Sequence, residues 1–257
     1  VDAGWRLHLP GLAGEPLQRW DERGTRWRTT FDEQLRVIAL SENDEADVDV
    51  FTYADASADA AHNLRGQLLT HKDRSGTLST DSFALTRQAL TQTRTFEDGE
   101  AFTSQWRFSP LGALLEQTDA GGHRQRSSYG LAGQLKQVHL RVSGKTDWQP
   151  VLLDMQYNAA TQIIEQLAGN RVRSRWTYAL ADGRLHTQSS RKEAGEVLQD
   201  FEYFHDRVGN IIRIEDHAFQ PVYFANQLIN GHRDFSYDSL YRLTRATGYD
   251  DAPPSDI

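Results

Sequence analysis

The segment that decides the fold runs from Asp234 to Gly248 and reads Asp-Phe-Ser-Tyr-Asp-Ser-Leu-Tyr-Arg-Leu-Thr-Arg-Ala-Thr-Gly. At its centre an aromatic residue precedes an acidic residue, two variable positions and a turn residue, after which apolar and polar side chains alternate. The acidic side chain can accept a hydrogen bond from a backbone amide two residues on, and a glycine three residues after it supplies positive φ without a clash. The segment therefore predicts a tight turn between two β-strands.

The same order of residues recurs along the chain, with His205 where an aromatic is expected. From Phe108 to Tyr237 the successive copies lie 21, 28, 21, 27 and 32 residues apart. About 20 residues hold two strands of about 5–6 residues each with their turns, so each copy predicts one β-hairpin. The residues expected to define the repeat are Trp20, Asp21, Gly24, Phe31, Asp32, Phe108, Gly112, Tyr129, Gly133, Tyr157, Asn158, Tyr178, Asp182, Gly183, Tyr203, His205, Asp206, Gly209, Asn210, Phe235, Tyr237, Asp238 and Leu243.

The repeat predicts an all-β fold in which tandem antiparallel hairpins form a curved strip. Residues 1–250 are expected to make up this strip, with an acidic loop at 41–62 and a further loop at 143–150. Residues 251–257 are expected to be an unstructured tail or a linker to a downstream region. The chain begins with Val rather than Met, which is typical of a fragment or a processed piece.

The composition favours a thin sheet over a compact core. Apolar residues make up 38% of the 257 residues, below the usual 45–50%, while aromatic residues reach 10% and include six tryptophans. That many aromatic residues argues against disorder. The formal net charge of −8, without a basic stripe, argues against nucleic acid as a partner. No apolar run approaches 18 residues, so the chain is not expected to be embedded in a membrane.

No sequence motif marks an active site. The nine histidines lack paired metal-ligand spacing, and neither a nucleophile elbow nor a phosphate-binding loop is present. Most acidic residues recur at the turn position of the repeat, where backbone bonding explains them. We therefore expect no catalytic, cofactor-binding or metal-binding residues, no cofactor and no enzymatic activity. Cysteine is absent, which excludes disulfides and thiolate metal sites.

Two alternative functions stay open at this point. A β-rich carbohydrate- or surface-binding module could stack sugars on exposed tryptophans, for which the candidates are Trp5, Trp27, Trp106, Trp148 and Trp176. A glycosidase-like enzyme would need two carboxyl groups about 5–9 Å apart in a cleft. Aromatic packing between hairpins is the simpler interpretation of the tryptophans.

The repeats resemble the YD repeats of the Rhs family, and above all the C component (TccC type) of bacterial insecticidal Tc toxin complexes. The runs that carry the resemblance are Asn63–Leu68, Tyr157–Ala160, Ala168–Asn170, Leu198–Asp200, Val208–Ile211, Asn226–Gln227 and Tyr237–Leu243. The resemblance implies a long β-strip that winds into a hollow shell (a cocoon), which the B component closes. The shell would hold a cytotoxic effector until delivery through the pore of the A component.

The resemblance also implies the partners and the location. The partners would be the B component and the remainder of the C component, and the complex would be made in the bacterial cytoplasm and then secreted. The family's aspartyl autoprotease and its effector have no counterpart among these residues, so only the structural role of a shell segment is carried over. About 180 residues of strand would cover about 2,900 Å². That area is too small to enclose a folded domain of about 100 residues.

Overall fold

The computed structural model describes residues 4–224 and 227–248, and all of the regular structure in these residues is β-strand. The first ten strands are β1 (Arg6–Pro10), β2 (Pro16–Asp21), β3 (Arg26–Phe31), β4 (Val37–Glu42), β5 (Glu45–Tyr53), β6 (Leu68–Asp73), β7 (Gly76–Phe83), β8 (Ala89–Phe96), β9 (Ala101–Phe108) and β10 (Leu114–Thr118). The others are β11 (Arg124–Tyr129), β12 (Leu135–Arg141), β13 (Gln149–Tyr157), β14 (Ile163–Ala168), β15 (Arg173–Tyr178), β16 (Leu185–Arg191), β17 (Val197–His205), β18 (Ile211–Asp216), β19 (Val222–Phe224), β20 (Gln227–Ile229), β21 (Arg233–Tyr237) and β22 (Leu243–Ala246).

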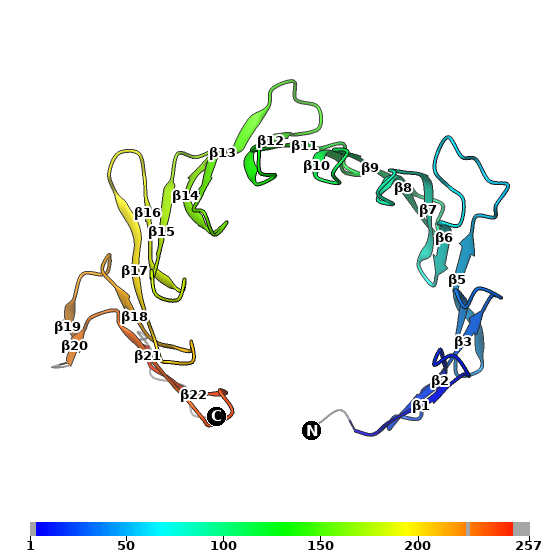
Figure 1. The fold of residues 1–257 in the computed structure, drawn as a ribbon, viewed down its shortest axis with the longest axis horizontal. Coiled ribbons are helices and arrows are strands. Elements are labelled where there is room, and N and C mark those ends of the chain that lie inside the picture. The colour runs from blue at the N-terminus through cyan, green and yellow to red at the C-terminus, as the bar shows by residue number, and fades with distance from the viewer. Residues whose placement is uncertain (1–3, 225–226, 249–257) are drawn as a thin grey trace. The chain divides into compact units, whose positions relative to one another are not determined.

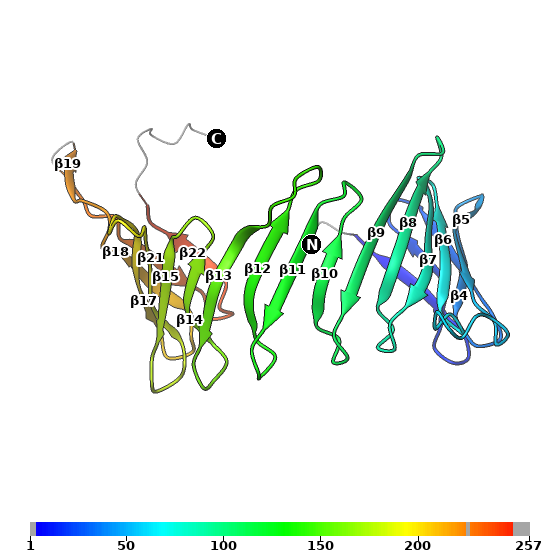
Figure 2. The ribbon, with the colours of Figure 1, turned by 90° about the horizontal axis from the view of Figure 1, so that it is seen from above.

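Neighbours in sequence are neighbours in the sheet. Each strand from β1 to β10 pairs antiparallel with the next, and so does each strand from β12 to β17. The next partner of β18 is β21. The two strands that lie between them in the sequence, β19 and β20, pair with each other as a separate two-stranded sheet. Figure 2 shows β6, β7, β8 and β9 of the first unit lying side by side in this order. The prediction of an all-β fold of tandem antiparallel hairpins is confirmed.

The chain divides into two compact units. The first contains the residues up to Arg126 together with Arg141–Thr146, and the second contains Ser127–Leu140 and the residues from Asp147 onward. In Figure 1 the first unit carries the blue to green strands β1 to β10, and the second ends at β22 in red. The predicted extent of the strip, residues 1–250, stays a prediction, and the predicted tail at 251–257 lies outside the described residues.

The turns explain why the hairpins form where they do. In the turn between β2 and β3, the Asp21 amide donates to the Thr25 carbonyl at 3.2 Å, and the Gly24 amide donates to the Asp21 carbonyl at 3.0 Å. Gly24 has φ of 82°, which closes the turn in the left-handed region. This is a three-residue hairpin loop, a type I turn followed by a left-handed residue.

The acidic loop predicted at 41–62 is wrong over half of its length. β4 reaches Glu42, a turn at Asn43 follows with φ of 53°, and β5 covers Glu45–Tyr53. The physical reason is alternation, because acidic and apolar side chains take turns along β5 as a strand requires. A cation in the turn between β6 and β7 compensates two of the acids: Arg74 Nη2 lies 2.6 Å from Glu42 and 2.8 Å from Glu45. The loop itself covers residues 54–67.

The loop predicted at 143–150 is shorter than expected. β12 ends at Arg141 and β13 begins at Gln149, so the connection covers residues 142–148. Pro150 therefore lies inside a strand, where a register shift between Val138 and His139 of the partner strand accompanies it. A proline is tolerated in a strand at such an irregularity because it has no amide to donate.

The sheet has almost no closed core. The apolar side chains that are buried among the described residues are Ala54, Phe83, Leu152 and Met155. The accessible surface is 18043 Å², whereas a compact protein of this mass would expose about 11,500 Å². Both faces of the sheet are therefore in contact with solvent over much of their area. Among the described residues no helix is long and apolar enough to cross a membrane.

Candidate functional site

The acidic residue of the repeat acts as an acceptor for the turn backbone. The Asp206 Oδ1 atom accepts the amides of Val208, Gly209 and Asn210 at 3.0, 2.8 and 2.9 Å. The side-chain amide of Asn210 donates to Asp206 Oδ2 at 2.8 Å. This bond, followed by those from the backbone amides, holds the pKa of Asp206 below its usual value. The carboxylate thus stabilises the turn and is saturated with donors.

The other copies of the turn reproduce this arrangement with different side chains. Asp32 accepts the amides of Gln34 and Arg36, and Asp238 accepts those of Leu240 and Arg242. In each case the bond from the backbone amide four residues on is the main cause that lowers the pKa of the aspartate. In two further copies, Asn158 and Asp21 each accept two backbone amides through their Oδ1 atoms. Asp182 accepts one backbone amide. Gly130 has no side chain, so its turn is held by backbone hydrogen bonds.

The left-handed position of the turn is not always a glycine. Gly24, Gly112, Gly133, Gly183 and Gly209 occupy it with positive φ, as the repeat predicts. In three other copies the position is held by Leu35, Thr161 and Tyr241, with φ of 57°, 64° and 60°. Side chains with a Cβ atom are strained in this region, and a β-branched one more than most. The turn chemistry of the repeat therefore overrides local preference at these positions.

The anchor aromatics end their strands directly before the turn. Tyr157, Tyr178, His205 and Tyr237 are the last residues of β13, β15, β17 and β21, and the register shifts next to each of them. Phe31, Phe108 and Tyr129 likewise end β3, β9 and β11, and Trp20 is the last residue but one of β2. Tyr203 and Phe235 lie two residues before the anchors His205 and Tyr237. Leu243 begins β22.

Three of the anchors connect neighbouring strands through their hydroxyl groups. Tyr157 donates to the Leu135 carbonyl at 2.9 Å and Tyr178 to the Ile163 carbonyl at 2.8 Å, in each case at the first residue of the adjacent strand. Tyr237 makes the same bond to Ile211 at 2.8 Å. Burial raises the pKa of Tyr157 and of Tyr178. Sequence reasoning anticipated ring contacts between hairpins, and the hydroxyl bonds were missed.

One face of the first unit carries a glutamate held by three arginines. Glu116 on β10 accepts Arg126 Nε at 2.9 Å, is bonded by Arg124, and lies 3.5 Å from Arg107. The glutamate side chain is only 10% exposed, and a cavity of about 400 Å³ adjoins it. Burial, followed by the charges of Arg141, Arg126 and Arg107, lowers the pKa of Arg124. The cluster is positively charged as a whole.

The second unit repeats this cluster with less positive charge. Glu165 on β14 accepts Arg175 Nε at 2.8 Å and is also bonded by Arg173, so the glutamate and its two arginines have the same spacing as in the first unit. These bonds, led by that from Arg175, lower the pKa of Glu165. The residue opposite Glu165 on the preceding strand is Gln156, where Arg107 stands opposite Glu116. In the sequence only the lack of a basic stripe was noted, and the pairing of these arginines with Glu165 was missed.

The candidate tryptophans are divided between the two units, and most of them are half-buried. Trp5 is 54% exposed, whereas Trp27, Trp106, Trp148 and Trp176 are half-buried. Trp27 is covered by the Arg19 guanidinium, 4.2 Å from the ring centre. Trp5, Trp27 and Trp106 belong to the first unit and the other two to the second. This distribution does not favour the sugar-stacking alternative.

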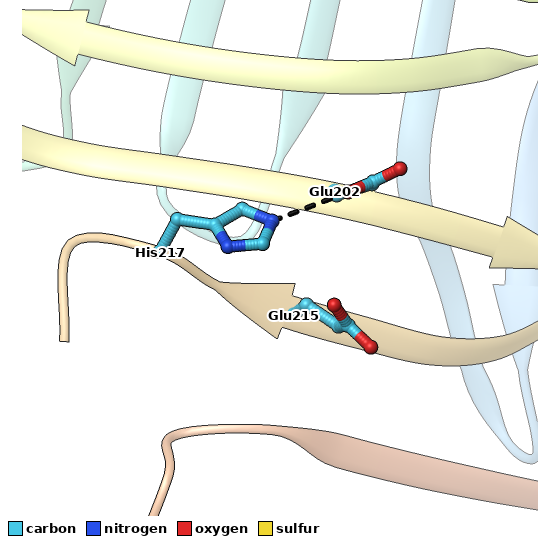
Figure 3. Close-up of side chains that lie close together, drawn as sticks. All are labelled: Glu202, Glu215 and His217. Atoms are coloured by element: carbon cyan, nitrogen blue, oxygen red, sulfur yellow. Dashed lines mark hydrogen bonds and ion pairs between the residues drawn. The ribbon is translucent and has the colours of Figure 1, made fainter. Parts of the chain in front are cut away.

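A group of two carboxylates and an imidazole lies on β17, on β18 and directly after β18 in the second unit. Glu202 stands directly opposite Glu215, and His217 follows two residues after Glu215. The ligand atoms of these three residues lie within 4.8 Å of one another, and His217 Nε2 is 3.2 Å from Glu202 (Figure 3). The sequence expectation assigned no role to His217. The sequence carries no signal for this pairing, because Glu202 meets Glu215 only through the register of β17 with β18.

Comparison with known proteins gives a consistent picture. The sequence matches no established family model. It is 30% identical to the toxin subunit YenC1 of Yersinia entomophaga over 96% of this chain, and 30% identical to the toxin subunit YenC2 of the same organism over 72% of it. The chain spans 29% and 22% of the lengths of these two subunits.

Solved structures agree with the sequence relatives. A crystal structure of TcdB2-TccC3 matches with a TM-score of 0.84 and 30% identity over 96% of this chain, which corresponds to 13% of the matched chain. The holotoxin pore structure of Photorhabdus luminescens, which contains TccC3, matches with a TM-score of 0.82, 30% identity and the same coverage. The sequence match and the fold match therefore both cover 96% of this chain.

Proposed function

Since the chain is homologous to the toxin subunits YenC1 and YenC2 and belongs with the YD-repeat components of Tc toxins, we propose that it forms part of a shell wall. The shell encloses a cytotoxic effector together with a B component, and the effector leaves through an A-component pore. The complex is secreted from the bacterium that makes it. The chain's own contribution is steric: the wall isolates the effector and has no catalytic step.

The observation that carries the proposal is the single layer of sheet. A protein that works through a core or a cleft buries a set of large side chains, whereas the buried apolar side chains of the described residues are four, and one of these is an alanine. The sheet is instead stabilised by interactions within the layer. These are the backbone pairing of neighbouring strands, the hydrogen bonds of the turn aspartates and the tyrosine hydroxyl bonds between strands. Such a layer suits a wall that has solvent on one side and cargo on the other.

The edge of the first unit supports assembly with further strands. β1 pairs with β2 along one side. Leu7 and Leu9 on β1 are 58% and 46% exposed, and Trp5 directly before the strand is 54% exposed. Trp5, Leu7 and Leu9 are two residues apart in sequence, so their side chains lie on the same face of the extended segment. An apolar edge strand tends to pair with another chain. We expect this edge to contact the remainder of the toxin subunit or the B component.

The test is co-expression of the chain with a B-type subunit such as TcdB2, followed by affinity purification and size-exclusion chromatography with light scattering. The expected result is a stable complex of the two chains, and self-association of the chain when it is expressed alone. The double variant Leu7→Lys/Leu9→Lys should lose the complex. The control Leu131→Lys, at a turn position that is 112% exposed, should retain it.

If the chain is a monodisperse monomer and does not bind the B-type subunit, the proposal is wrong. Unchanged far-UV circular dichroism of both variants is required to show that the lysines act on assembly and leave the strands intact. Glycan binding by the purified chain would instead support the carbohydrate-binding alternative.

A further inference from the structure

The carboxylate and imidazole group on β17, on β18 and directly after β18 forms a set of donors that the role of a wall does not explain. We propose that Glu202, Glu215 and His217 bind a zinc ion. Glu202 and Glu215 face each other across the two strands, and His217 lies on the same face as Glu215 because the residues are two apart. Figure 3 shows the His217 ring directed toward Glu202 and the Glu215 carboxylate beside them.

Two more imidazoles border the group. His186 Nε2 on β16 lies 3.8 Å from Glu202 Oε1, and His232 Nδ1, next to β21, lies 3.9 Å from Glu215 Oε1. Three histidines and two glutamates thus come together from four segments of the second unit. An isolated pair of a histidine and a carboxylate is common on a protein surface. The ligand atoms of Glu202, Glu215 and His217 lie within 4.8 Å of one another, so these three would hold the ion, and a water molecule or a bordering imidazole would supply the fourth ligand.

The negative charge of the group favours binding of a cation. Like charges directly opposite each other on paired strands are destabilising, and Glu202 and Glu215 are such a pair. Arg213 lies 3.5 Å from Glu215 but donates its Nε atom to Asp234 at 2.7 Å, so its charge is shared. The carboxylates of Glu202, Glu215 and Asp234 with the guanidinium of Arg213 sum to a net charge of −2. A divalent cation would neutralise that charge.

The donor types select zinc among the common divalent ions. Calcium and magnesium prefer shells made of oxygen atoms, whereas zinc takes imidazole nitrogen and carboxylate oxygen together. The side chains of Glu202, Glu215 and His217 are 28%, 20% and 48% exposed, so an ion can reach them from solvent. Bound there, zinc would join β17 to the segment after β18 and stiffen this part of the sheet.

The test measures zinc directly on the full chain. Metal-free protein is incubated with zinc chloride, desalted and analysed for bound metal, and the affinity is measured by isothermal titration calorimetry. We expect one zinc ion per chain and a melting temperature that rises with zinc. Glu215→Gln and His217→Asn should each weaken zinc binding by at least about tenfold. His62→Gln is the matched control, because His62 pairs with the single carboxylate of Asp59 and should leave zinc binding unchanged.

Three outcomes overturn the proposal. The chain retains no zinc after desalting, or both ligand variants bind zinc as well as the wild type does, or the melting temperature follows pH without responding to zinc. The last result would assign the group to proton binding alone. Circular dichroism of the variants guards against loss of fold, and Glu202→Gln replaces any variant that fails this check. None of these measurements depends on assembly with a B-type subunit, so they are independent of the proposed function.

Discussion

The hydroxyl of Tyr178 donates a hydrogen bond of 2.8 Å to the carbonyl oxygen of Ile163 on the neighbouring strand. The donor is the last residue of β15 and the acceptor is the first residue of β14, so the bond closes the open end of that strand pair. The tyrosine of the repeat is therefore a connector between strands, and its aromatic ring alone does not explain its recurrence.

Loss of this hydroxyl should weaken the sheet measurably. Tyr178→Phe keeps the ring but leaves the half-buried Ile163 carbonyl without its partner, which should cost about 1 kcal/mol of the free energy of unfolding. Urea unfolding followed by circular dichroism measures the difference. Phe108→Tyr is the reciprocal control, since an aromatic ring already ends β9 there. An unchanged unfolding midpoint for Tyr178→Phe would show that the ring alone is responsible.

The two glutamate clusters should differ in their sensitivity to neutralisation. Glu116→Gln leaves three arginines facing a neutral amide and should destabilise the chain by about 1–3 kcal/mol. Glu165→Gln, in the matching cluster with two arginines, should cost less. Chemical denaturation at low and at moderate salt measures both, and added salt should reduce the difference because it screens the arginines. Equal losses at both sites would contradict this prediction.

Local turn chemistry made most of the fold predictable from the sequence. The aspartate at Asp206 and the glycine at Gly209 have the roles that their spacing indicates, and the hairpins follow from them. Alternation inside an acidic segment was misread at Glu45–Tyr53, because charge was taken as a sign of a loop. The compensating cation, Arg74, lies 29 residues from Glu45 in sequence, and only strand pairing reveals it.

The charged groups were not predictable because they depend on register. Glu116 and Arg126, or Glu202 and Glu215, meet only when two strands pair at one particular offset. A shift of one residue would send either side chain to the opposite face. The turn that fixes the offset also contains a bulge, so the offset cannot be counted without knowing the turn type. Composition and motif spacing carry no information about such pairs.

The left-handed turn position provides a reciprocal pair of substitutions. A Cβ atom on Gly133, which has φ of 82°, would meet no atom within 4 Å, so Gly133→Ala tests backbone strain alone. It should destabilise the chain by about 1 kcal/mol. Thr161 holds the same position with φ of 64°, so Thr161→Gly should remove strain and match or exceed the stability of the wild type.

Thermal unfolding of both variants provides the measurement, and Gly130→Ala is the control, because Gly130 lies in the same turn as Gly133 but outside the left-handed region. If Gly133→Ala were neutral and Thr161→Gly destabilising, the turn geometry would not govern the stability of the repeat.

The turn aspartates should make the fold sensitive to acid. Hydrogen bonds hold the pKa values of Asp32, Asp206 and Asp238 below the ordinary value of 3.8. A carboxyl group whose pKa is lower in the folded state contributes stability that is fully present above its unfolded pKa. That contribution disappears as pH falls through the folded value. The unfolding midpoint should therefore change little from these groups between about pH 7 and pH 5, and fall below about pH 4.

Asp206→Asn separates this effect from general acid damage. The amide oxygen of asparagine can still accept the three backbone amides, so the turn should form at neutral pH, while the group no longer titrates. The variant should lose less stability than the wild type between pH 5 and pH 3 in urea unfolding. Asp44→Asn, at an exposed carboxylate 3.5 Å from Arg26, serves as the control and should follow the wild type more closely. If Asp206→Asn lost as much stability on acidification as the wild type, the turn carboxylate at this position would not be a source of the acid sensitivity.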